Sequence, residues 1–560
     1  MMGNMREKVQ QLLKEVLQEL AQAGSFNFPQ TDFLIERPKD DRFGEFTSNV
    51  ALVAYAFFAH ALNEKANQEI VYAGKNKQLD VKNPVSLAEK IVEKIKEREV
   101  DFLEDVKVAG PGHINFYLSQ KEVSSVVEKI LSEGEKYGAS TVGQGVKVNN
   151  EFISANPTGP LHLGNARGGF YTDTLSNVFR KTGFDVTNEY YVNDAGEQVM
   201  KLGHSVLKDS EAVYGGEYID EIISNFQFPI SKPSVREAGE KSAEYILENM
   251  IKKSVAEKMQ ITFDVWTSEK KIIEDGYVDK ALVILKEKNL TFENEGALWL
   301  RTTEFGDDKD RVLVKQDGVK TYFASDAGYI LQKMERGFTS FIETWGADHH
   351  GYISRFKAVA QALGFEGEIR FLIVQMVKVV KDGMEVRMSK RAGNVISVDE
   401  LIETVGHDVA RFFFLMYAPE THMNFDLGLA QERSQKNPVY YVQYAHARLC
   451  SILRKAEEEE LGVERGDLAL LIHPKERELI RELMFFPELV ETVSADFSVH
   501  KLPQYAMKLA DKFHSFYDAC RVIDKEQKEL TLARLELVRA TRVVLAETLA
   551  LMGISAPEKM

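Results

Sequence analysis

The stretch VKVNNEFISANPTGPLHLGNARGGFYTDTLSNVFRKTGFDVTNEYYV, residues 146–192, decides the class of fold. Its opening VKVNNEFIS has the composition of a strand, and the prolines and glycines of NPTGP end that strand sharply. Apolar residues at helical spacing run over 165–182 and stop at Gly183, as in a helix with a glycine stop. FDVTNEYYV is a second strand candidate. A strand, a tight loop, a helix and a strand in succession form a β-α-β unit, which predicts a parallel sheet.

The chain downstream of this unit predicts an insertion and then further strands. Residues 205–290 are charged and mostly helical in pattern, so a helical insertion is expected there. Strand-like segments return between residues 297 and 380, and they are ALWLRTT, RVLVKQD, TYFAS, FIETWGA and IRFLIVQMVKVV.

The two flanks of this α/β region differ from it. Residues 6–22 have apolar positions at helical spacing, and FLEDVKVAGPGHINFYLS predicts two short strands around a Gly-Pro-Gly turn. Residues 1–118 are therefore expected to form one small α+β module, which the charged helical stretch 121–137 links to the next domain. After about Asp399 the pattern is almost wholly helical.

Composition sets outer limits on the function. A chain of 560 residues with 44% hydrophobic and 28% charged residues suggests three to four globular domains. The net charge of −16 argues against a broadly basic nucleic-acid-coating protein, although it leaves room for a local basic groove. Two cysteines, Cys450 and Cys520, cannot form a disulfide framework, and no stretch is apolar enough to span a membrane. A cytoplasmic protein is expected.

The densest set of candidate functional residues is NPTGPLHLGNARGG, at 156–169. His162 and Asn165 fall just before or at the start of the predicted helix, where free N–H groups and the positive end of the dipole favour a phosphate. An imidazole there can donate a hydrogen bond to phosphoryl oxygens as charge develops. The segment matches neither a Walker loop nor GxGxxG, and a structural turn with an incidental histidine explains it about as well.

A second candidate is VVKDGMEVRMSKRAGN, at 379–394. It places Arg387, Ser389, Lys390 and Arg391 in a loop bounded by glycines, which suits charge that appears only in a transition state, such as that on leaving pyrophosphate. Taken alone, a basic surface loop is the better explanation, because charge runs are usually just solvated.

Together, the two segments resemble the paired HIGH and KMSKS signatures of class I aminoacyl-tRNA synthetases. The first has Asn165 in place of the final histidine; the second has Arg387 and Arg391 in place of the first lysine and the last serine, and keeps Lys390. EFISANPTGPLHLGNARG, EYYVNDAGEQ, GADHHGYISR, NPVYYVQYAHAR and the terminal LMGISAPEKM resemble the arginyl-tRNA synthetases specifically. The resemblance extends over essentially the whole chain.

The resemblance implies an α/β Rossmann-like doubly wound parallel-sheet catalytic core over 119–400, with the helical insertion at about 205–290. It further implies an N-terminal α+β domain that binds the tRNA elbow (1–118) and a C-terminal all-α helical bundle that binds the anticodon (401–560). The expected activity joins L-arginine to the terminal adenosine of tRNA(Arg) through arginyl-adenylate. ATP with Mg²⁺ is the expected co-substrate, no structural metal is expected, and the family is mostly monomeric.

Site residues follow from the same resemblance, position by position. The catalytic residues are expected to be His162, Asn165 and Lys390. Arginine is expected to contact Glu151, Ser154, Asn156, Tyr322 and Asp326, since a carboxylate pairs with a guanidinium in bidentate fashion. ATP is expected to contact Pro157, Gly159, His162, Gly164, Asn165, Gly346, His349, Met388, Ser389 and Lys390. The HIGH-like motif as a whole consists of Ala155, Asn156, Pro157, Thr158, Gly159, Pro160, Leu161, His162, Leu163, Gly164 and Asn165.

Three alternatives stay open at this point. Asp348, His349 and His350 could suggest a metal site, but adjacent histidines at the end of a strand would point to opposite faces, so no metal is expected there. The chain could be a different class I nucleotidyl transferase, or a synthetase that acts on another substrate, and the paired carboxylates Glu151 and Asp326 argue against both. It could also be a non-catalytic RNA-binding relative, against which the retained His162 and Lys390 argue.

Overall fold

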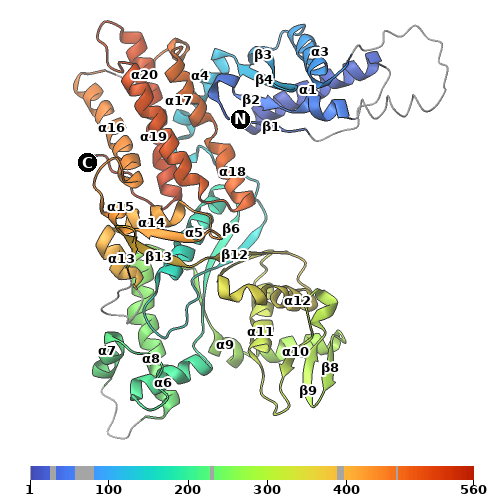
Figure 1. Ribbon diagram of the computed structural model, residues 1–560, viewed down its shortest axis with the longest axis vertical. Coiled ribbons are helices and arrows are strands. Elements are labelled where there is room, and N and C mark those ends of the chain that lie inside the picture. The colour runs from blue at the N-terminus through green and yellow to red at the C-terminus, as the bar shows by residue number, and fades with distance from the viewer. Residues whose placement is uncertain (1, 25–32, 57–80, 227–232, 387–395, 462–463) are drawn as a thin grey trace, which may run out of the picture.

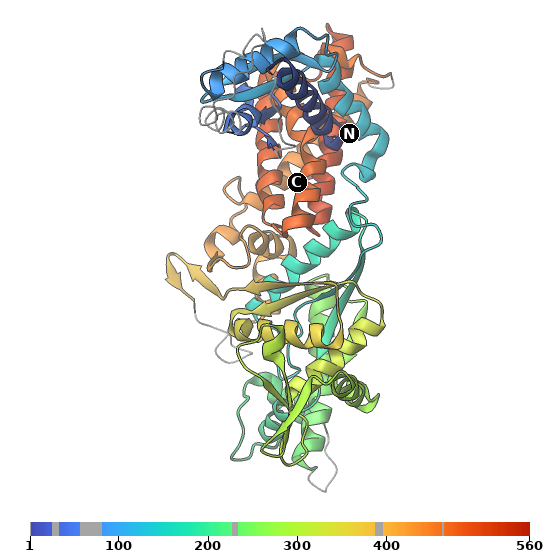
Figure 2. The ribbon, with the colours of Figure 1, turned by 90° about the vertical axis from the view of Figure 1, so that its right-hand side faces the viewer.

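The computed structural model describes residues 2–24, 33–56, 81–226, 233–386, 396–461 and 464–560. The molecule is elongated, with the N-terminal module and the C-terminal helices at one end and the parallel sheet with its insertions toward the other (Figure 1). A view turned by 90° shows the C-terminal helices standing over the sheet (Figure 2).

The N-terminal module packs two helices, α1 (Met2–Gly24) and α3 (Pro84–Lys96), with an antiparallel sheet. The strand order is β1-β2-β4-β3, with β1 at Ile35–Glu36, β2 at Phe46–Ser48, β3 at Leu103–Ala109 and β4 at His113–Leu118. The Gly-Pro-Gly turn joins β3 to β4, and Gly110 and Gly112 take φ angles of 53° and 123° there, which glycine adopts without a steric penalty.

A five-stranded parallel sheet forms the centre of the protein. It consists of β5 (Lys147–Glu151), β6 (Asp185–Val192), β7 (Val265–Ser268), β11 (Ser340–Gly346) and β12 (Glu368–Val374), in the order β12-β11-β5-β6-β7. The chain therefore winds outward in both directions from β5, and the doubly wound α/β prediction is confirmed. Ligands of such sheets bind at the carboxyl ends of the strands where the winding reverses, here between β5 and β11.

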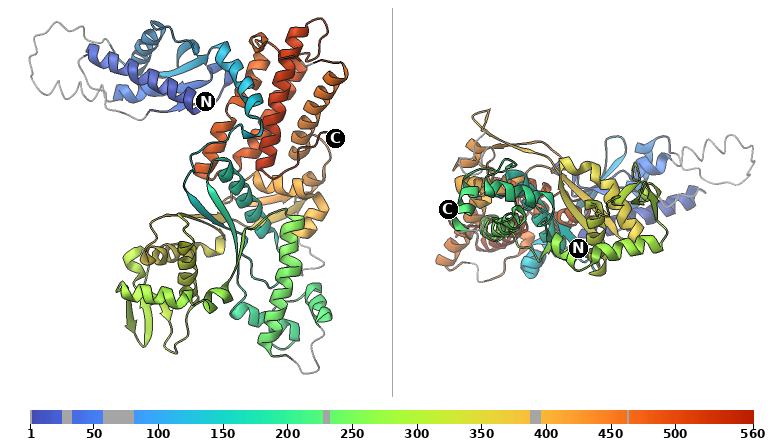
Figure 3. Two further views of the ribbon diagram at one scale, coloured as in Figure 1. Left: turned by 180° about the vertical axis from the view of Figure 1, so that it is seen from behind. Right: turned by 90° about the horizontal axis from the view of Figure 1, so that it is seen from below.

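Helix α5 (Leu163–Lys181) joins this sheet to the C-terminal helices, as the view from behind shows (Figure 3). It is lined by buried polar side chains that bond across the junction. Arg167 donates to the carbonyls of Ala418 and Thr421, each at 2.7 Å. Asp173 pairs with the buried Arg411 of α14 (His407–Leu415). These bonds connect the sheet side of α5 to the C-terminal helical region.

The segment 205–290, predicted as a helical insertion, contains one element that the prediction lacked. Helices α6 (Glu197–Leu207), α7 (Glu217–Asn225) and α8 (Val235–Ile246) lead through two π-helical turns to β7, which is an edge strand of the main sheet. Helices α9 (Glu269–Glu274) and α10 (Tyr277–Glu287) follow. A strand of four residues is too short to show a period, which is why the pattern concealed it.

Two small sheets follow. Strands β8 (Thr291–Asn294), β9 (Ala297–Leu300) and β10 (Arg311–Val314) form an antiparallel sheet, and β13 (Val377–Lys381) pairs with β14 (Met384–Glu385) and β15 (Met423–Asp426). TYFAS, predicted as a strand, instead begins α11 (Tyr322–Glu335), because Thr321 accepts a hydrogen bond from Ala324 N and caps that helix. Helix α12 (Ile353–Leu363) precedes β12.

The C-terminal region is mainly helical, with β15 as an addition to the expected pattern. After α13 (Val398–Val405) and α14, its helices are α15 (Leu427–Gln431), α16 (Pro438–Glu458), α17 (Pro474–Met484), α18 (Phe486–Asp496), α19 (Lys501–Ala519) and α20 (Lys528–Leu551). Among the helices that the structure describes, none has the length and apolar character needed to cross a membrane.

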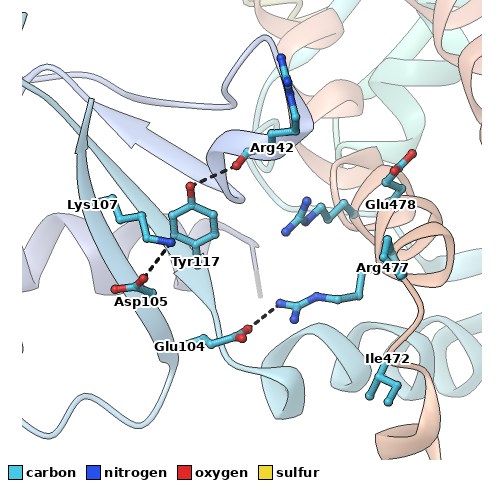
Figure 4. Close-up of a pocket in the computed structure, with 10 residues that line it drawn as sticks. Arg42, Glu104, Asp105, Lys107, Tyr117, Ile472, Arg477 and Glu478 are labelled. Carbon is cyan, nitrogen blue, oxygen red and sulfur yellow. Dashed lines mark hydrogen bonds and ion pairs between the residues drawn. The ribbon is translucent and has the colours of Figure 1, made fainter. Parts of the chain in front are cut away.

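Ion pairs hold the N-terminal module against α17. Arg37 bonds to Glu482 at 2.6 Å, and Arg477 bonds to Glu104 at 2.9 Å. Between the module and α17 lies a hollow of about 420 Å³, which Tyr117 of the module and Arg477 of α17 line from opposite sides (Figure 4). Its cations are matched by neighbouring carboxylates, so this hollow serves as a junction that fixes the module beside the bundle.

Candidate active site

A strained turn places the first site residues at the carboxyl end of β5. Ile153 and Ser154 take φ angles of 65° and 37°, which cost a residue other than glycine of the order of 1–3 kcal/mol and cluster at functional sites. The turn lets Ser154 Oγ donate to Glu151 Oε1 at 3.0 Å and accept from Tyr191 N at 3.0 Å. The hydrogen bond from Tyr191 of the neighbouring strand β6 thus helps to stabilise the strained turn.

His162 and Asn165 cap the N-terminus of α5 reciprocally. His162 Nδ1 accepts from Gly164 N at 3.1 Å, and Asn165 Oδ1 accepts from His162 N at 3.0 Å. Because Nδ1 is the acceptor, a neutral His162 carries its proton on Nε2, where it can donate outward. Burial lowers the pKa of His162, which favours this neutral form. An asparagine at the last position of the motif therefore keeps the cap that orients the histidine.

Glu151 is already paired within the protein. Its Oε2 accepts from Tyr329 Oη and from Lys333 Nζ, each at 2.6 Å, and Lys333 also bonds to Glu343 at 2.7 Å. Lys333 is fully buried, and neighbouring carboxylates keep its pKa above the ordinary value although burial opposes this. Sequence reasoning missed Tyr329 and Lys333, which lie three and seven positions beyond Asp326 on one face of α11.

Asp326 and Glu269 are different, because burial raises the pKa of both carboxyls to about 7. The charge of Glu151 raises the pKa of Asp326 further while Arg355 lowers it; Asp326 and Asp194 raise that of Glu269. Glu269 is only 4% exposed, and its buried Oε2 has no hydrogen-bond partner among the described residues. Two acidic side chains thus lie close together, and neither forms an ion pair with another described residue. Sequence reasoning missed Glu269, which directly follows the missed strand β7.

Tyr322 and Asn156 are the two exposed members of the expected arginine contacts. Tyr322 is 58% exposed, and its hydroxyl accepts from Glu197 N at 3.1 Å at the start of α6. Asn156 is exposed on the loop after β5. The structure joins Ser154 to Glu151 by a hydrogen bond and brings Asp326 close enough for the charge of Glu151 to raise its pKa. Tyr322 lies one helical turn before Asp326, on the first turn of α11.

The expected ATP residues divide into three groups. Pro157, Gly159, His162, Gly164 and Asn165 belong to the loop and helix start just described. Gly346 is the last residue of β11, and His349 lies in the short 3₁₀ helix that residues 347–352 form directly after it, instead of at a strand end. The His349 ring lies 6.3 Å from that of Trp345. Met388, Ser389 and Lys390 lie outside the described residues.

The chain on either side of residues 387–395 is nevertheless fixed beside the site. Val386 N donates to Val379 O at 2.8 Å on the strand side. On the other side, Ser397 forms a β-bridge with His162, and Val398 N donates to Leu161 O at 3.0 Å. The described chain therefore stops beside β13 at residue 386 and resumes next to the HIGH-like loop at residues 396–398.

Three family descriptions match successive parts of the chain. Residues 7–118 match the arginyl tRNA synthetase N terminal domain, residues 234–412 the catalytic domain of class I (R) tRNA synthetases, and residues 442–560 the DALR anticodon binding domain. Among solved structures, the arginyl-tRNA synthetase of Thermus thermophilus shares the fold with a TM-score of 0.72 at 21% identity, over 99% of this chain and 100% of that one. Methionyl-tRNA synthetase of Mycobacterium tuberculosis has a TM-score of 0.55 at 12% identity, over 73% and 92%.

Closer relatives match over the full length. The arginine–tRNA ligase of Geobacillus kaustophilus is 42% identical over 586 aligned residues, which cover 100% of this chain and 99% of that protein. The arginine–tRNA ligase of Bacillus subtilis is 40% identical over 580 aligned residues, which cover 100% of both. The resemblance seen in the sequence motifs is therefore confirmed, and the chain belongs to the arginyl-tRNA synthetase family of class I synthetases and is an arginine–tRNA ligase.

Proposed function

We propose that the pocket between β5, α9 and α11 binds the guanidinium of L-arginine, and that the N-terminus of α5 binds the phosphates of ATP with its Mg²⁺. The arginine carboxylate attacks the α-phosphorus in line, which gives arginyl-adenylate and releases pyrophosphate. A ribose hydroxyl of the terminal adenosine of tRNA(Arg) then attacks the activated carbonyl, and AMP leaves. No enzyme nucleophile is needed, so the protein contributes positioning and charge stabilisation.

The observation that carries the proposal is that Asp326 and Glu269 lie close enough together to raise the pKa of Glu269, and that neither forms an ion pair with another described residue. Burial of carboxylates without a counter-ion raises the free energy of the folded protein. A guanidinium, which is planar and always protonated, offsets this by bidentate hydrogen bonding. Glu151 and Ser154 line the same pocket, with the charge of Glu151 offset by Lys333. Tyr322 and Asn156 close the rim. An uncharged amino acid would leave these carboxylates unpaired, so it is rejected strongly without a separate editing site.

On the ATP side, His162 and Asn165 are the proposed catalytic residues together with Lys390. The Nε2–H group of His162 lies on the side of the ring away from the cap, so it can donate a hydrogen bond to a phosphate. The free N–H groups and the dipole at the start of α5 add positive potential there. Lys390 neutralises the leaving pyrophosphate; the bridge of Ser397 to His162 supports its approach to the phosphates. The remaining contacts are proposed for Pro157, Gly159, Gly164, Gly346, His349, Met388 and Ser389.

The flanking domains are proposed to hold the tRNA. Residues 1–118 contact its elbow and residues 401–560 its anticodon, around a catalytic core over 119–400. The ion-paired junction of Arg477 with Glu104 supports a fixed spacing between the two contacts. We further propose that the enzyme is monomeric and works in the cytoplasm.

The test is ATP–pyrophosphate exchange with each of the twenty amino acids, with and without total tRNA. Exchange that responds to arginine alone supports the pocket assignment, and its dependence on tRNA tells whether the site assembles only on the complex. Tight tRNA binding without exchange under either condition would contradict the proposal and indicate a non-catalytic relative.

A further inference from the structure

A row of three glutamates crosses the parallel sheet, with the proposed arginine contact Glu151 at its centre. Glu151 of β5 is in register with Glu343 of β11 on one side and with Glu189 of β6 on the other. Side chains at one register position of neighbouring parallel strands point to the same face of the sheet. All three glutamates are buried. The row therefore concentrates carboxylates in the interior, and only its central member is a proposed substrate contact.

Helix α11 and the residue that ends it cover this row. Arg336 pairs with Glu189 at 2.7 Å, and Lys333 pairs with Glu151 at 2.6 Å. Tyr329 lies between these two pairs, with its hydroxyl 2.6 Å from Glu151 Oε2 and 3.1 Å from Glu189 Oε1. A hydroxyl has a single proton to donate, and the shorter distance assigns that proton to Glu151.

The hydroxyl of Tyr329 is held in a fixed position. Its ring lies 4.5 Å from the ring of Tyr191 on β6, and Lys333 Nζ lies 4.3 Å from its centroid. Burial raises the pKa of Tyr329 well above its ordinary value, so the hydroxyl keeps the proton that it donates. A donor that is fixed in this way also fixes the orientation of the carboxylate that accepts from it.

The two oxygens of Glu151 have different surroundings. Oε2 accepts from Tyr329 and Lys333, so it is bonded to the interior of the protein. Oε1 accepts from one described donor, Ser154 at 3.0 Å, and a carboxylate oxygen can accept a further hydrogen bond. Asp326 lies close enough for the charge of Glu151 to raise its pKa. A guanidinium can therefore find one acceptor on each of two neighbouring carboxyl groups.

We propose that Tyr329 is a positioning residue for arginine binding, which holds Oε2 of Glu151 and thereby turns Oε1 toward the substrate. The guanidinium then bridges Glu151 Oε1 and Asp326. Such a bridge suits a planar fork of N–H donors better than the compact ammonium group of lysine. Tyr329 itself does not touch the substrate. This inference rests on the proposed function, since it concerns the same pocket.

The test compares Tyr329→Phe with the unaltered full-length enzyme in ATP–pyrophosphate exchange with total tRNA present. The KM for arginine should rise about tenfold, while kcat and the KM for ATP stay unchanged, because a less well oriented Glu151 weakens binding of arginine in the ground state and the transition state alike. A merely structural role would not produce a change confined to the arginine KM. The matched control is Tyr171→Phe, which removes a buried hydroxyl that donates to Phe497 O at 2.8 Å and should leave the arginine KM unchanged.

A double-mutant cycle shows whether Tyr329 acts through Glu151. In a Glu151→Gln background, Tyr329→Phe should add little to the rise in the arginine KM, because the carboxylate that it positions is already lost. Effects that multiply independently, an unchanged arginine KM in Tyr329→Phe, or loss of the fold in that variant would each overturn the inference. Failure of the unaltered enzyme to exchange with arginine would overturn the proposed function as well, so the two failures can be told apart.

Discussion

Replacing Glu269 by glutamine should make this enzyme worse at binding arginine and more stable at the same time. Glu269 is buried, its Oε2 has no partner among the described residues, and its pKa is raised to about 7. A group with these properties weakens the folded protein whenever it is ionised. It is retained, on our proposal, because the guanidinium of the substrate supplies the missing counter-charge.

The stability effect follows from proton linkage. A carboxyl whose pKa is higher in the folded than in the unfolded state costs no stability below the unfolded value of 4.5, and its cost grows with pH until it is complete above about 7. Since one pKa unit corresponds to about 1.4 kcal/mol, the full cost is roughly 3 kcal/mol. Glu269→Gln should therefore raise the free energy of unfolding by up to that amount at pH 8 and leave it almost unchanged at pH 4.5.

The effect on function has the opposite sign. Loss of a hydrogen bond to a charged group is worth about 1.5–3 kcal/mol, so the KM for arginine in the exchange assay should rise about 10- to 150-fold at pH 8. In the unaltered enzyme this KM should fall as pH rises from 6 to 8, because Asp326 and Glu269 both ionise near pH 7 and only the ionised forms pair with the guanidinium. The variant should show a shallower dependence, which reflects Asp326 alone.

The matched control is Glu274→Gln, which removes an exposed carboxylate from the same helix α9. It should change neither the arginine KM nor the denaturation midpoint at pH 8. A Glu269→Gln enzyme that loses stability at pH 8, or that keeps the arginine KM of the unaltered enzyme, would refute the assignment of Glu269 to the guanidinium.

Three further variants test the rest of the site. Lys333→Met should cost about 3–5 kcal/mol of stability, because it leaves the buried carboxylates Glu151 and Glu343 without their shared cation; thermal denaturation would show a large loss, and a midpoint within a degree of the original would contradict it. His162→Ala should lower kcat for arginine activation about 10²–10³-fold with little change in the arginine KM, as expected for a donor that acts on developing charge; a purely raised KM would argue for a substrate-binding role instead. Lys390→Ala should likewise lower kcat far more than it raises the arginine KM, and normal turnover would exclude its role at pyrophosphate.

Much of the fold could be predicted because its signals are local. The glycine stop at Gly183 has a φ of 88°, so it ends α5 as the sequence predicted, and the β-α-β unit around it determines the parallel sheet. The errors arose where tertiary context outweighs pattern. β7 has only four residues, and its pairing with β6 defines it as a strand. TYFAS has the composition of a strand, but the cap at Thr321 starts a helix there.

In the site as well, some features could be predicted from sequence motifs, whereas others exist only in the folded chain. The residues of the HIGH-like motif lie consecutively in the chain, so their grouping needed no structure. The special property of Glu269 is that none of the described residues forms an ion pair with it, and this depends on every element packed around it. The same holds for Glu151, which its motif predicts as a partner of the substrate, yet α11 brings Lys333 and Tyr329 to it first. A carboxylate that is neutralised internally shapes the pocket, whereas one left unmatched is available to the substrate. On our proposal, the balance between Glu151, Asp326 and Glu269 sets the specificity for arginine, and that balance can be seen only in the folded chain.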